Sequence, residues 1–376
     1  MPRSHYLAAV LPAPHAPIRL EEFPAPALEP GGALLRTLYS EVCGTDVHLR
    51  HGRLAGVPYP IIPGHVSVGA VEALAGPLRD AEGRPIKEGD VVTFLDVHET
   101  CHRCWYCLVA KQSTRCPHRR VYGITYGAAD GLLGGWAEAI WLKPGVKVVP
   151  FPPGLAPETF IGGGCGLTTA LHAIDLAGIR LGDTVAVLGA GPVGQSAVAL
   201  AALSGADEII VVGAPADRLA FAVRMGATRT LSLEPAPADR AAQVRDWTGG
   251  RGVDVVIEAS GAPEAVGQAL DLVRDGGRVI VAGQYTDHGD VTLNPHSQIN
   301  RKHVEIRGCW GSDFSHFHRA VALAARHGDR FPWRDLAARR YPLREAEAAL
   351  DAVERREVVK AVIAVDPSMA GAPPAG

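Results

Sequence analysis

Hydrophobic positions change their spacing near residue 167, and the change predicts two kinds of structure in one chain. Before it, short runs of alternating apolar and polar residues are separated by glycine and proline, as in residues 33–38 and 89–94. Such runs predict a compact β-rich domain. After it, apolar strand-like runs alternate with longer alanine-rich stretches, and this pattern predicts βαβ units around a parallel sheet.

The second region predicts strands and helices in alternation. The predicted strands cover residues 184–188, 208–212, 253–257, 278–282 and 304–307. The predicted helices cover residues 192–204, 216–225, 238–247 and 263–273. Beyond residue 312 the alternation fades, and we expect the strand-like run 358–365 to return to the first domain. Residues 366–376 are rich in proline, glycine and alanine and predict a frayed tail.

Length and charge narrow the classes of function. A chain of 376 residues is too long for one typical core and suggests two domains of ordinary size. The net charge of -3 argues against a nucleic-acid-binding surface. The sequence has no signal-peptide pattern and no run of 18 apolar residues, so we expect a cytoplasmic protein with no membrane partner.

Four of the seven cysteines lie close together in the sequence. Cys101, Cys104, Cys107 and Cys116 are separated by two, two and eight residues. Four thiolates can enclose a tetrahedral zinc ion with no open position, which is the arrangement of a structural site. In a chain without export signals such a cluster is more typical of metal binding than of disulfides. We expect the remaining Cys309 to be a small buried side chain.

Three further candidate metal ligands stand in separate motifs. Residues 41–48 read Glu-Val-Cys-Gly-Thr-Asp-Val-His, and Pro-Gly-His follows at 63–65. Cys165 lies far downstream in a glycine cluster that can turn sharply. Cys43, His65 and Cys165 together predict a zinc site with two thiolates and one imidazole. Its fourth position is open, which is typical of catalytic rather than structural zinc.

A glycine-rich turn between a predicted strand and a predicted helix indicates a dinucleotide site. The turn is Gly189-Ala190-Gly191-Pro192-Val193-Gly194, which matches the pattern G-x-G-x-x-G. The first glycine permits a tight turn, the second lets a pyrophosphate approach the backbone, and the third allows close packing of helix on strand. The phosphate charge meets the N–H groups that begin the helix. We expect NAD or NADP to bind at Gly189, Gly191, Pro192, Val193 and Gly194.

The choice between NAD and NADP stays open. A carboxylate at the end of the second strand would bind the ribose 2′-hydroxyl and repel a 2′-phosphate. Gly213 stands at that place, followed by Asp217 and Arg218. Asp217 fits a helix-capping role, and Arg218 either reaches a 2′-phosphate or faces solvent. Gly213 and Arg218 are therefore candidate cofactor contacts for either nucleotide.

Together these motifs make the chain resemble the zinc-dependent medium-chain alcohol and polyol dehydrogenase family. The resemblance implies an α/β fold with a GroES-like catalytic domain, residues 1–166 and 313–376, which carries a structural-zinc lobe at about 98–120. It implies a Rossmann NAD(P)-binding domain with a doubly wound parallel sheet at residues 167–312. The implied reaction moves a hydride between a primary or secondary alcohol, or its aldehyde or ketone, and NAD(P). Two zinc ions per chain and a homodimer or homotetramer follow from the same resemblance.

The resemblance also assigns roles to single residues. Thr45 would accept the alcohol proton and pass it through the cofactor ribose to His48. Asp46 would orient the imidazole of His65. We also expect cofactor contacts at Thr169 and at Lys360, which matches a basic family position near the pyrophosphate.

Two departures from the family pattern bear on the expected chemistry. The glutamate that usually follows Gly-His, and that can act as a transient zinc ligand, is replaced by Val66, so zinc should be held by fewer anionic groups. The last spacing of the cysteine cluster is eight residues instead of the commoner seven. An NADPH-dependent biosynthetic reductase of a C=X group is an alternative that Gly213 favours. A non-catalytic nucleotide-binding scaffold is a third hypothesis, suggested by Val66.

Overall fold

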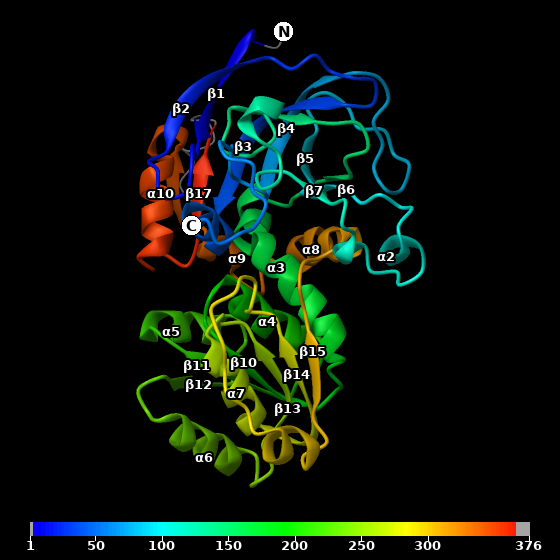
Figure 1. The fold of residues 1–376 in the computed structure, drawn as a ribbon. Coiled ribbons are helices and arrows are strands. Elements are labelled where there is room, and N and C mark those ends of the chain that lie inside the picture. The colour runs from blue at the N-terminus through cyan, green and yellow to red at the C-terminus, as the bar shows by residue number, and fades with distance from the viewer. Residues whose placement is uncertain (1–2, 366–376) are drawn as a thin grey trace. The chain divides into compact units, whose positions relative to one another are not determined.

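A computed structural model describes residues 3–365, so the tail predicted at residues 366–376 lies outside the described residues. The described chain divides into two units (Figure 1). The first unit contains the chain up to Gly164, the segment Asp313–Arg326 and the chain from Trp333 onward. The second unit contains Cys165–Ser312 and His327–Pro332. The short segment His327–Pro332 thus leaves the first unit, which the sequence pattern had not indicated.

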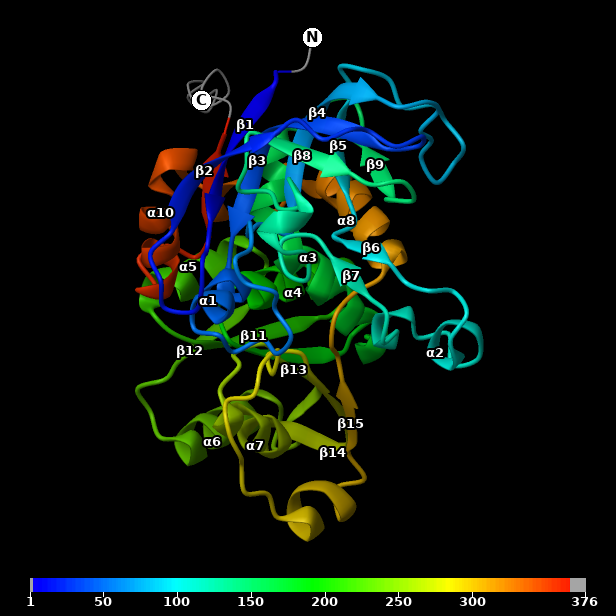
Figure 2. The ribbon, with the colours of Figure 1, turned by 45° about the horizontal axis from the view of Figure 1, so that its top comes forward.

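Most strands of the first unit belong to one sheet. Its strand order is β16-β17-β3-β4-β5-β9, and β8 also pairs with β3. Two smaller ladders pair β1 with β2 and β6 with β7 (Figure 2). The strands are β1 (His5–Val10), β2 (Arg19–Pro24), β3 (Ala33–Val42), β4 (Ser67–Leu74), β5 (Val91–Phe94), β6 (Val97–Glu99), β7 (Arg120–Val121), β8 (Ala139–Leu142), β9 (Val148–Pro150), β16 (Arg339–Pro342) and β17 (Ala361–Ala364). The helices that lie wholly or mainly in this unit are α1 (Gly44–Arg50), α2 (Trp105–Leu108), α8 (Phe314–His327), α9 (Trp333–Leu336) and α10 (Ala346–Glu354).

Strand β3 organises this unit because it pairs with three other strands. Its ten residues are buried except Arg36, so both of its faces are covered. It runs antiparallel to β4, β8 and β17. The predicted return of the run 358–365 is confirmed, since β17 places Ala361 opposite Val42 at the end of β3.

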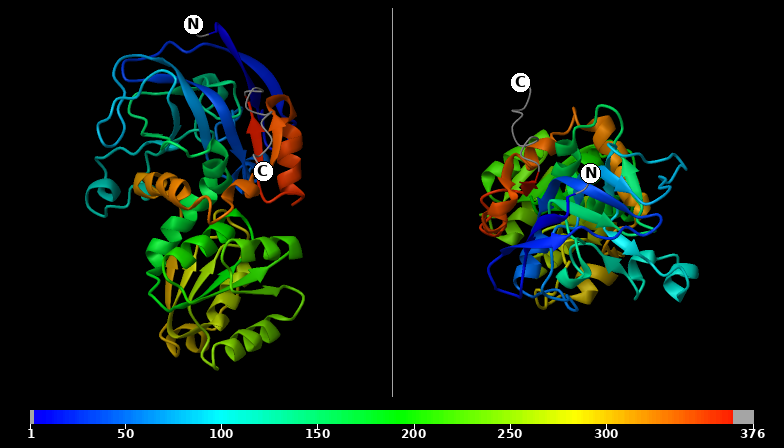
Figure 3. Two further views of the ribbon diagram at one scale, coloured as in Figure 1. Left: turned by 180° about the vertical axis from the view of Figure 1, so that it is seen from behind. Right: turned by 90° about the horizontal axis from the view of Figure 1, so that it is seen from above.

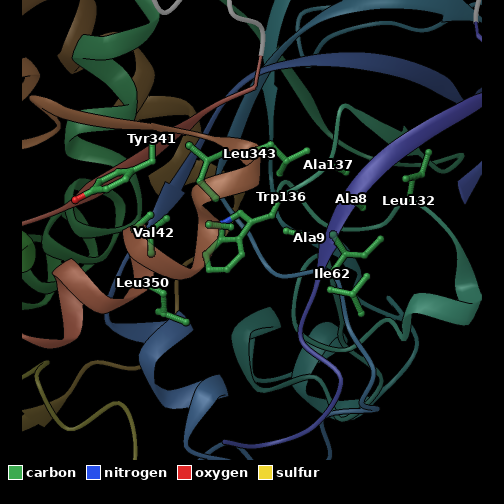
Figure 4. Packing of buried hydrophobic residues seen from close by; sticks show 14 of the residues in the cluster. Ala8, Ala9, Val42, Ile62, Leu132, Trp136, Ala137, Tyr341, Leu343 and Leu350 are labelled. Atoms are coloured by element: carbon green, nitrogen blue, oxygen red, sulfur yellow. The ribbon is translucent and has the colours of Figure 1, made fainter. Parts of the chain in front are cut away.

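A buried cluster joins both ends of the chain beside β3 (Figure 4). Ala8 and Ala9 from β1 pack in it with Leu343 and Leu350 from the C-terminal part. Trp136 is fully buried in the same cluster, and its indole Nε1 donates a hydrogen bond to the Glu41 carbonyl over 3.2 Å. Packing in the core therefore fixes the end of β3, where the candidate metal ligands begin.

The second unit is a parallel six-stranded sheet with helices on both faces. The strand order is β12-β11-β10-β13-β14-β15, and each neighbouring pair is parallel. Helices α4 and α5 cover one face and α6 and α7 the other (Figures 1 and 3). The elements are β10 (Thr184–Leu188), α4 (Pro192–Leu203), β11 (Glu208–Gly213), α5 (Ala216–Arg224), β12 (Arg229–Ser232), α6 (Pro237–Trp247), β13 (Val253–Glu258), α7 (Pro263–Leu272), β14 (Val273–Val281) and β15 (Glu305–Gly308). The predicted doubly wound α/β fold is confirmed.

The order of these strands locates a ligand site. Strand β10 lies between β11 and β13, and the chain turns away from β10 in opposite directions on its two sides. In open parallel sheets, ligands bind beyond the carboxyl ends of the strands at this switch point. Gly189 and Gly191 directly follow β10, so the glycine-rich turn stands at the switch point.

The largest differences from the predicted strands are at β12 and β14. β12 was not predicted, because its sequence Arg-Thr-Leu-Ser has a single apolar residue; in the structure all four residues are half-buried. β14 begins at Val273, five residues before the predicted start, and follows α7 without a loop. A register shift between Val253 and Val255 accompanies the pairing of β13 with this early part of β14.

Helix α3 (Pro157–Ala177) carries the glycine cluster and is bent inside it. Gly164 has φ 47° and ψ -136°, which is not helical, so α3 is two helical segments joined at this residue. The bend lies immediately before Cys165 and turns the helix where the predicted third ligand stands. Within residues 3–365, no helix combines the length and the apolar character needed to cross a membrane.

Candidate active site and metal centres

Cys43 is held at the junction between β3 and α1. It is the N-cap residue of α1 and has an extended backbone, with φ -137° and ψ -172°. Its N–H donates to Asp46 Oδ2 over 2.8 Å, which satisfies the backbone on entry to the helix. Cys43 is buried, so its sulfur is positioned by both strand pairing and the helix cap.

Four side chains bring potential metal-ligating atoms together in one cluster. The members are Glu41, Cys43, His65 and Cys165, and one atom of each lies within 4.8 Å of those of the other three. Cys43 Sγ is 3.9 Å from His65 Nε2, and His65 Nε2 is 3.6 Å from Glu41 Oε1. The first three are buried and Cys165 is half-buried. The structure thus brings together the three predicted ligands and adds a carboxylate.

The donor set and its spacing fit zinc. Ordinary bond lengths of about 2.3 Å to sulfur and about 2.0 Å to nitrogen, at tetrahedral angles, place a sulfur and a nitrogen about 3.5 Å apart. The separation of 3.9 Å between Cys43 Sγ and His65 Nε2 is close to that value. Two thiolates and one imidazole are also the ligand type that leaves a further position for chemistry.

Electrostatics in the cluster call for a positive charge. Burial would lower the pKa of His65, but the charge of Cys43 and its hydrogen bond, followed by Asp46 and Glu41, raise that pKa well above its usual value. In the protein alone, a proton on the imidazole partly compensates the negative charge of these acidic groups. A bound divalent cation would take the place of that proton and would compensate the charge of the thiolates directly.

Asp46 lies beside His65, as the proposed orienting role requires. Burial, with the charge of Cys43 second, raises the pKa of Asp46 well above its usual value, and the charge of His65 opposes the rise. Asp46 Oδ1 and His65 Nδ1 are both buried, and neither has a hydrogen-bond partner among the described residues. Buried polar atoms are nearly always satisfied. These two atoms are those that the expected contact between carboxylate and imidazole would join, so this role stays a prediction.

Glu41 is the member of the cluster to which the sequence motifs gave no role. Its carboxylate is fully buried, and its Oε2 accepts a hydrogen bond from Lys360 Nζ over 2.7 Å. Lys360 Nζ also donates to the carbonyls of Ile161, over 3.2 Å, and Gly163, over 3.0 Å. Three donors of the ammonium thus face three protein oxygens, and Lys360 is fully buried. The expected contact of Lys360 with a cofactor pyrophosphate stays a prediction.

The second metal centre is the four-cysteine lobe. Cys104 Sγ lies 3.5 Å from Cys107 Sγ and 3.9 Å from Cys116 Sγ, and Cys116 Sγ lies 3.6 Å from Cys101 Sγ. A tetrahedral zinc with four thiolates places its sulfurs about 3.8 Å apart. Hydrogen bonds, with that of the Arg103 N–H first, lower the pKa of Cys101 to about 6, so one thiolate is available at neutral pH. The cluster therefore fits a closed zinc site.

The lobe has little apolar packing of its own. Trp105, Leu108 and Val109 are each more than half exposed, at 62%, 53% and 63%. A bound metal would then supply most of the order of the segment.

We expect Cys104→Ser to lower the zinc content by one per chain and to open the segment to trypsin at Arg103, Lys111 and Arg115. Zinc analysis and limited proteolysis check this. Ser113→Ala in the same lobe is the control, and equal resistance of the two variants would contradict the assignment.

The glycine-rich turn has the shape that a dinucleotide phosphate needs. Gly189 has φ 109°, a conformation that favours glycine, and its N–H donates to the Val212 carbonyl over 2.8 Å. Gly191 is the N-cap of α4 with Pro192 at the first helical position, and a β-carbon at Gly191 would meet nothing within 4 Å. Val193 follows in the first turn of α4. The backbone before this helix is therefore open to an approaching anion.

Gly194 sets how closely α4 packs on the turn. A β-carbon at Gly194 would lie 1.9 Å from the Gly189 carbonyl oxygen. We expect Gly194→Ala to push α4 outward and to weaken dinucleotide binding by about 10- to 100-fold, since overpacking costs about 1–3 kcal/mol. Calorimetric titration with NAD and NADP measures the loss. Gly308→Ala, where the added carbon meets nothing within 4 Å, should bind normally. Normal binding by Gly194→Ala, or loss of zinc from it, would contradict this reading.

Gly213 ends β11 where a ribose-selecting carboxylate would stand. A β-carbon there would lie 3.0 Å from Ala190 Cβ and 3.2 Å from Ala190 N, so a longer side chain would require local movement. Arg218 lies in the first turn of α5, where its carbonyl accepts a hydrogen bond from Gln195 over 2.8 Å. Asp217 lies in the first turn of α5 and accepts from the Arg218 N–H over 2.9 Å, while the N-cap residue of α5 is Pro215.

The remaining predicted residues lie on helices that carry metal-ligand candidates. Thr45 and His48 are three residues apart on α1, so they share a face, and both are half-buried. Thr169 is half-buried on α3, one helical turn after Cys165. Cys309 is buried, and burial raises its pKa to about 12, as expected of an unreactive thiol.

Comparisons with known proteins match both parts of the chain. Residues 29–153 match the family described as alcohol dehydrogenase GroES-like domain. Residues 192–326 match the family described as zinc-binding dehydrogenase. The first match contains Cys43, His65 and the four-cysteine lobe, and the second begins at Pro192 in the glycine-rich turn.

Individual relatives extend over nearly the whole chain. The 5-exo-hydroxycamphor dehydrogenase of Pseudomonas putida is 36% identical over 355 residues, which cover 92% of this chain and 95% of that protein. The erythritol/L-threitol dehydrogenase of Mycolicibacterium smegmatis is 30% identical over 366 residues, with 92% and 93% covered. The crystal structure of an alcohol dehydrogenase from Thermotoga maritima has a TM-score of 0.92 at 33% identity, covering 96% of this chain and 100% of that one.

Proposed function

Because this chain belongs to the zinc-dependent medium-chain dehydrogenase family, we propose that its Cys43, His65 and Cys165 hold a catalytic zinc ion. The protein is an oxidoreductase that acts on CH–OH groups. The convergence of the three ligand candidates with atoms within 4.8 Å carries the proposal. A second zinc in the four-cysteine lobe and NAD or NADP at the glycine-rich turn complete it.

The proposed reaction oxidises a primary or secondary alcohol, or reduces the matching aldehyde or ketone. When bound, zinc supplies a Lewis acid for the substrate oxygen, and NAD(P) accepts or donates the hydride. Cys43, His65 and Cys165 hold and orient the metal. We assign Asp46 the role of orienting the His65 imidazole, because Asp46 Oδ1 and His65 Nδ1 are both buried and neither has a hydrogen-bond partner among the described residues.

We assign proton transfer to two half-buried residues of α1, Thr45 and His48. Thr45 Oγ1 takes up the alcohol proton as its own hydroxyl proton is passed on toward the His48 imidazole, three residues later on the same helix face, which releases a proton to solvent. Both side chains are half-buried, unlike Cys43 and Asp46 on the same motif. The motif thus separates metal binding from proton movement along one helix.

The hydroxyl of Thr45 provides a specific test. We expect Thr45→Val to lower kcat by about 10²- to 10³-fold, in the range for a lost general acid–base contact. Zinc content should stay at two per chain. Thr45→Ser restores a hydroxyl and should recover most of the rate. Steady-state kinetics of the three forms check this, and a Thr45→Val enzyme as fast as the unmodified one would remove Thr45 from the mechanism.

Substrate and cofactor are settled by one experiment on the zinc-replete protein. Initial rates of NADH or NADPH formation are measured with primary, secondary and polyhydric alcohols, and the reverse rates with the matching carbonyls. We expect turnover with at least one alcohol or carbonyl pair. Absence of turnover with either cofactor, in protein that still binds NAD(P), would favour the nucleotide-binding scaffold instead.

A biosynthetic reductase using NADPH is the second candidate, and Gly213 favours it. No acidic side chain stands at this position to repel a 2′-phosphate, and Ala190 is too close for one to be added without movement. A kcat/KM for reduction with NADPH far above that for oxidation with NAD would support the reductase.

Assembly into two or four copies is also part of the proposal. Strand β15 supports it, because it is the edge of the six-stranded sheet and all four of its residues are exposed. Light scattering of the purified protein gives the number of copies.

A further inference from the structure

Glu41, in β3, lies opposite Val66, the residue that directly precedes β4. The pairing of β3 with β4 places Ser40 opposite Ser67, and one step further the Glu41 N–H donates to the Val66 carbonyl over 3.0 Å. Directly opposite residues of an antiparallel pair project from the same face. A carboxylate at position 41 therefore enters the space that a carboxylate at position 66 would otherwise reach.

The two oxygens of Glu41 face different partners. Oε2 is 2.7 Å from Lys360 Nζ, and Oε1 is 3.6 Å from His65 Nε2 within the metal-ligand cluster. Pairing of β17 with β3 explains the position of the lysine, because Ala361 lies opposite Val42 and Lys360 is the preceding residue. One carboxylate thus connects the ligand cluster to a fully buried ammonium group.

Charge balance favours this arrangement around a divalent metal. Two thiolates and a neutral imidazole bring a zinc ion to zero net charge, and Glu41 would then make the centre negative. The ammonium of Lys360 cancels that charge inside the protein. A buried pair of this kind is stable only when every partner is present, so the lysine and the carboxylate are expected to act together.

Gly164 shows how closely the pair is packed. A β-carbon there would lie 1.8 Å from Glu41 Oε2 and 2.6 Å from Lys360 Nζ. Gly164 immediately precedes Cys165, and its non-helical backbone forms the bend in α3. The same bend thus admits the Glu41–Lys360 pair and delivers the third ligand.

We propose that Glu41 is a fourth metal-binding side chain, which replaces from the opposite strand the carboxylate that Val66 lacks, with Lys360 as its fixed counter-charge. The inference rests on the proposed zinc site. Oε1 would hold the metal in the absence of substrate, and the hydrogen bond from Lys360 to Oε2 would keep the carboxylate in place when it does not bind the metal. The expectation that Val66 leaves the zinc with fewer anionic groups is thereby replaced.

The rate at which a chelator removes zinc tests this inference. The unmodified holoenzyme is compared with Glu41→Gln/Lys360→Met, which removes both charges and leaves neither group unpaired. Dipicolinate withdraws the metal, and a colorimetric zinc indicator follows the release. We expect the double variant to lose one zinc roughly 10- to 100-fold faster, the usual effect of removing a supporting group from a metal site. Zinc in the four-cysteine lobe is the internal control and should leave at an unchanged rate.

A rescue separates metal binding from packing. Adding Val66→Glu to the double variant restores a carboxylate on the same face, so zinc release should slow again toward that of the unmodified enzyme. The pair Asp254 and Arg274, joined over 2.6 Å in the second unit, provides a matched control. Asp254→Asn/Arg274→Met should leave release unchanged.

A crystal structure of the zinc-loaded enzyme without cofactor gives the direct measurement. We expect Glu41 Oε1 at about 2.0–2.2 Å from the catalytic zinc. An Oε1 more than 3 Å from that zinc would overturn the inference, as would unchanged release in the double variant or failure of Val66→Glu to slow it. In each of these cases the second zinc is present and the proposed function stands. An unmodified enzyme that never holds a second zinc would instead contradict the proposed function itself.

Discussion

Replacement of Cys165 by serine is expected to abolish turnover while dinucleotide binding persists. The serine hydroxyl stays protonated at neutral pH and binds zinc poorly, whereas the thiolate is the ligand form. Loss of the Lewis acid removes several kcal/mol of transition-state stabilisation, so kcat should fall by at least about 10³-fold. Zinc content should drop from two to one per chain. Metal analysis, steady-state kinetics and calorimetric titration with NAD(P) measure the three quantities.

Cys309→Ser is the matched control for this experiment. Cys309 is buried and belongs to neither metal-ligand cluster, so its replacement should leave both zinc ions and the turnover in place. Full activity of Cys165→Ser would show that the catalytic metal is bound elsewhere. Joint loss of zinc and of dinucleotide binding would indicate a folding defect rather than the loss of a ligand.

Gly164→Ala is expected to be among the most destabilising single-methyl changes in the first unit. The added carbon would lie 1.8 Å from Glu41 Oε2, which is a direct clash with a buried ion pair. Strain at φ 47° contributes about 1–3 kcal/mol and overpacking a similar amount. We expect the free energy of unfolding to fall by about 3–5 kcal/mol and the catalytic zinc to be lost. Denaturant unfolding and metal analysis test this.

Gly145→Ala separates backbone strain from the clash. Gly145 also has a positive φ, 88°, but a β-carbon there would meet nothing within 4 Å. Its replacement should cost only about 1 kcal/mol and should retain both zinc ions. Equal destabilisation by the two changes would mean that Glu41 and Lys360 tolerate displacement, which the tight packing around Gly164 does not predict.

Elements with a strong local pattern could be predicted from the sequence, and those without it could not. β10, α4 and β13 begin at the predicted residues, because each joins a continuous apolar run to a clear turn or helix start. β12 has a single apolar residue, so its strand conformation depends on pairing with β11. The transfer of residues 327–332 to the second unit likewise depends on tertiary contacts that no local pattern records.

In the candidate site too, residues in a distinct sequence motif could be predicted and residues without one could not. The cysteine and histidine ligands could be predicted from their residue types and motifs. The structure brings Cys43, His65 and Cys165 together. Glu41 lies in the same short stretch, but a glutamate two residues before a cysteine carries no distinct signal. Its significance comes from the pairing of β3 with β4, which sets it opposite Val66.

The pairing of Lys360 with Glu41 could not be predicted from the sequence. The resemblance assigns Lys360 a cofactor contact, which stays a prediction, and the structure adds a hydrogen bond to Glu41, 319 residues earlier. The missing carboxylate at position 66 predicted only that the zinc is held by fewer anionic groups, and it did not point to Glu41. The pairing register of β17, β3 and β4 shows that Glu41 lies beside Lys360 and opposite Val66.

Zinc content per chain, measured in protein purified without added metal or chelator, tests the central claim most directly. The claim predicts two zinc ions: one closed in the four-cysteine lobe and one held by Cys43, His65 and Cys165. Removal of the second by dipicolinate should abolish turnover, and added zinc should restore it. A value of one, unchanged by Cys165→Ser and abolished by Cys104→Ser, would contradict the claim, because the cluster around Cys43 would then hold no metal.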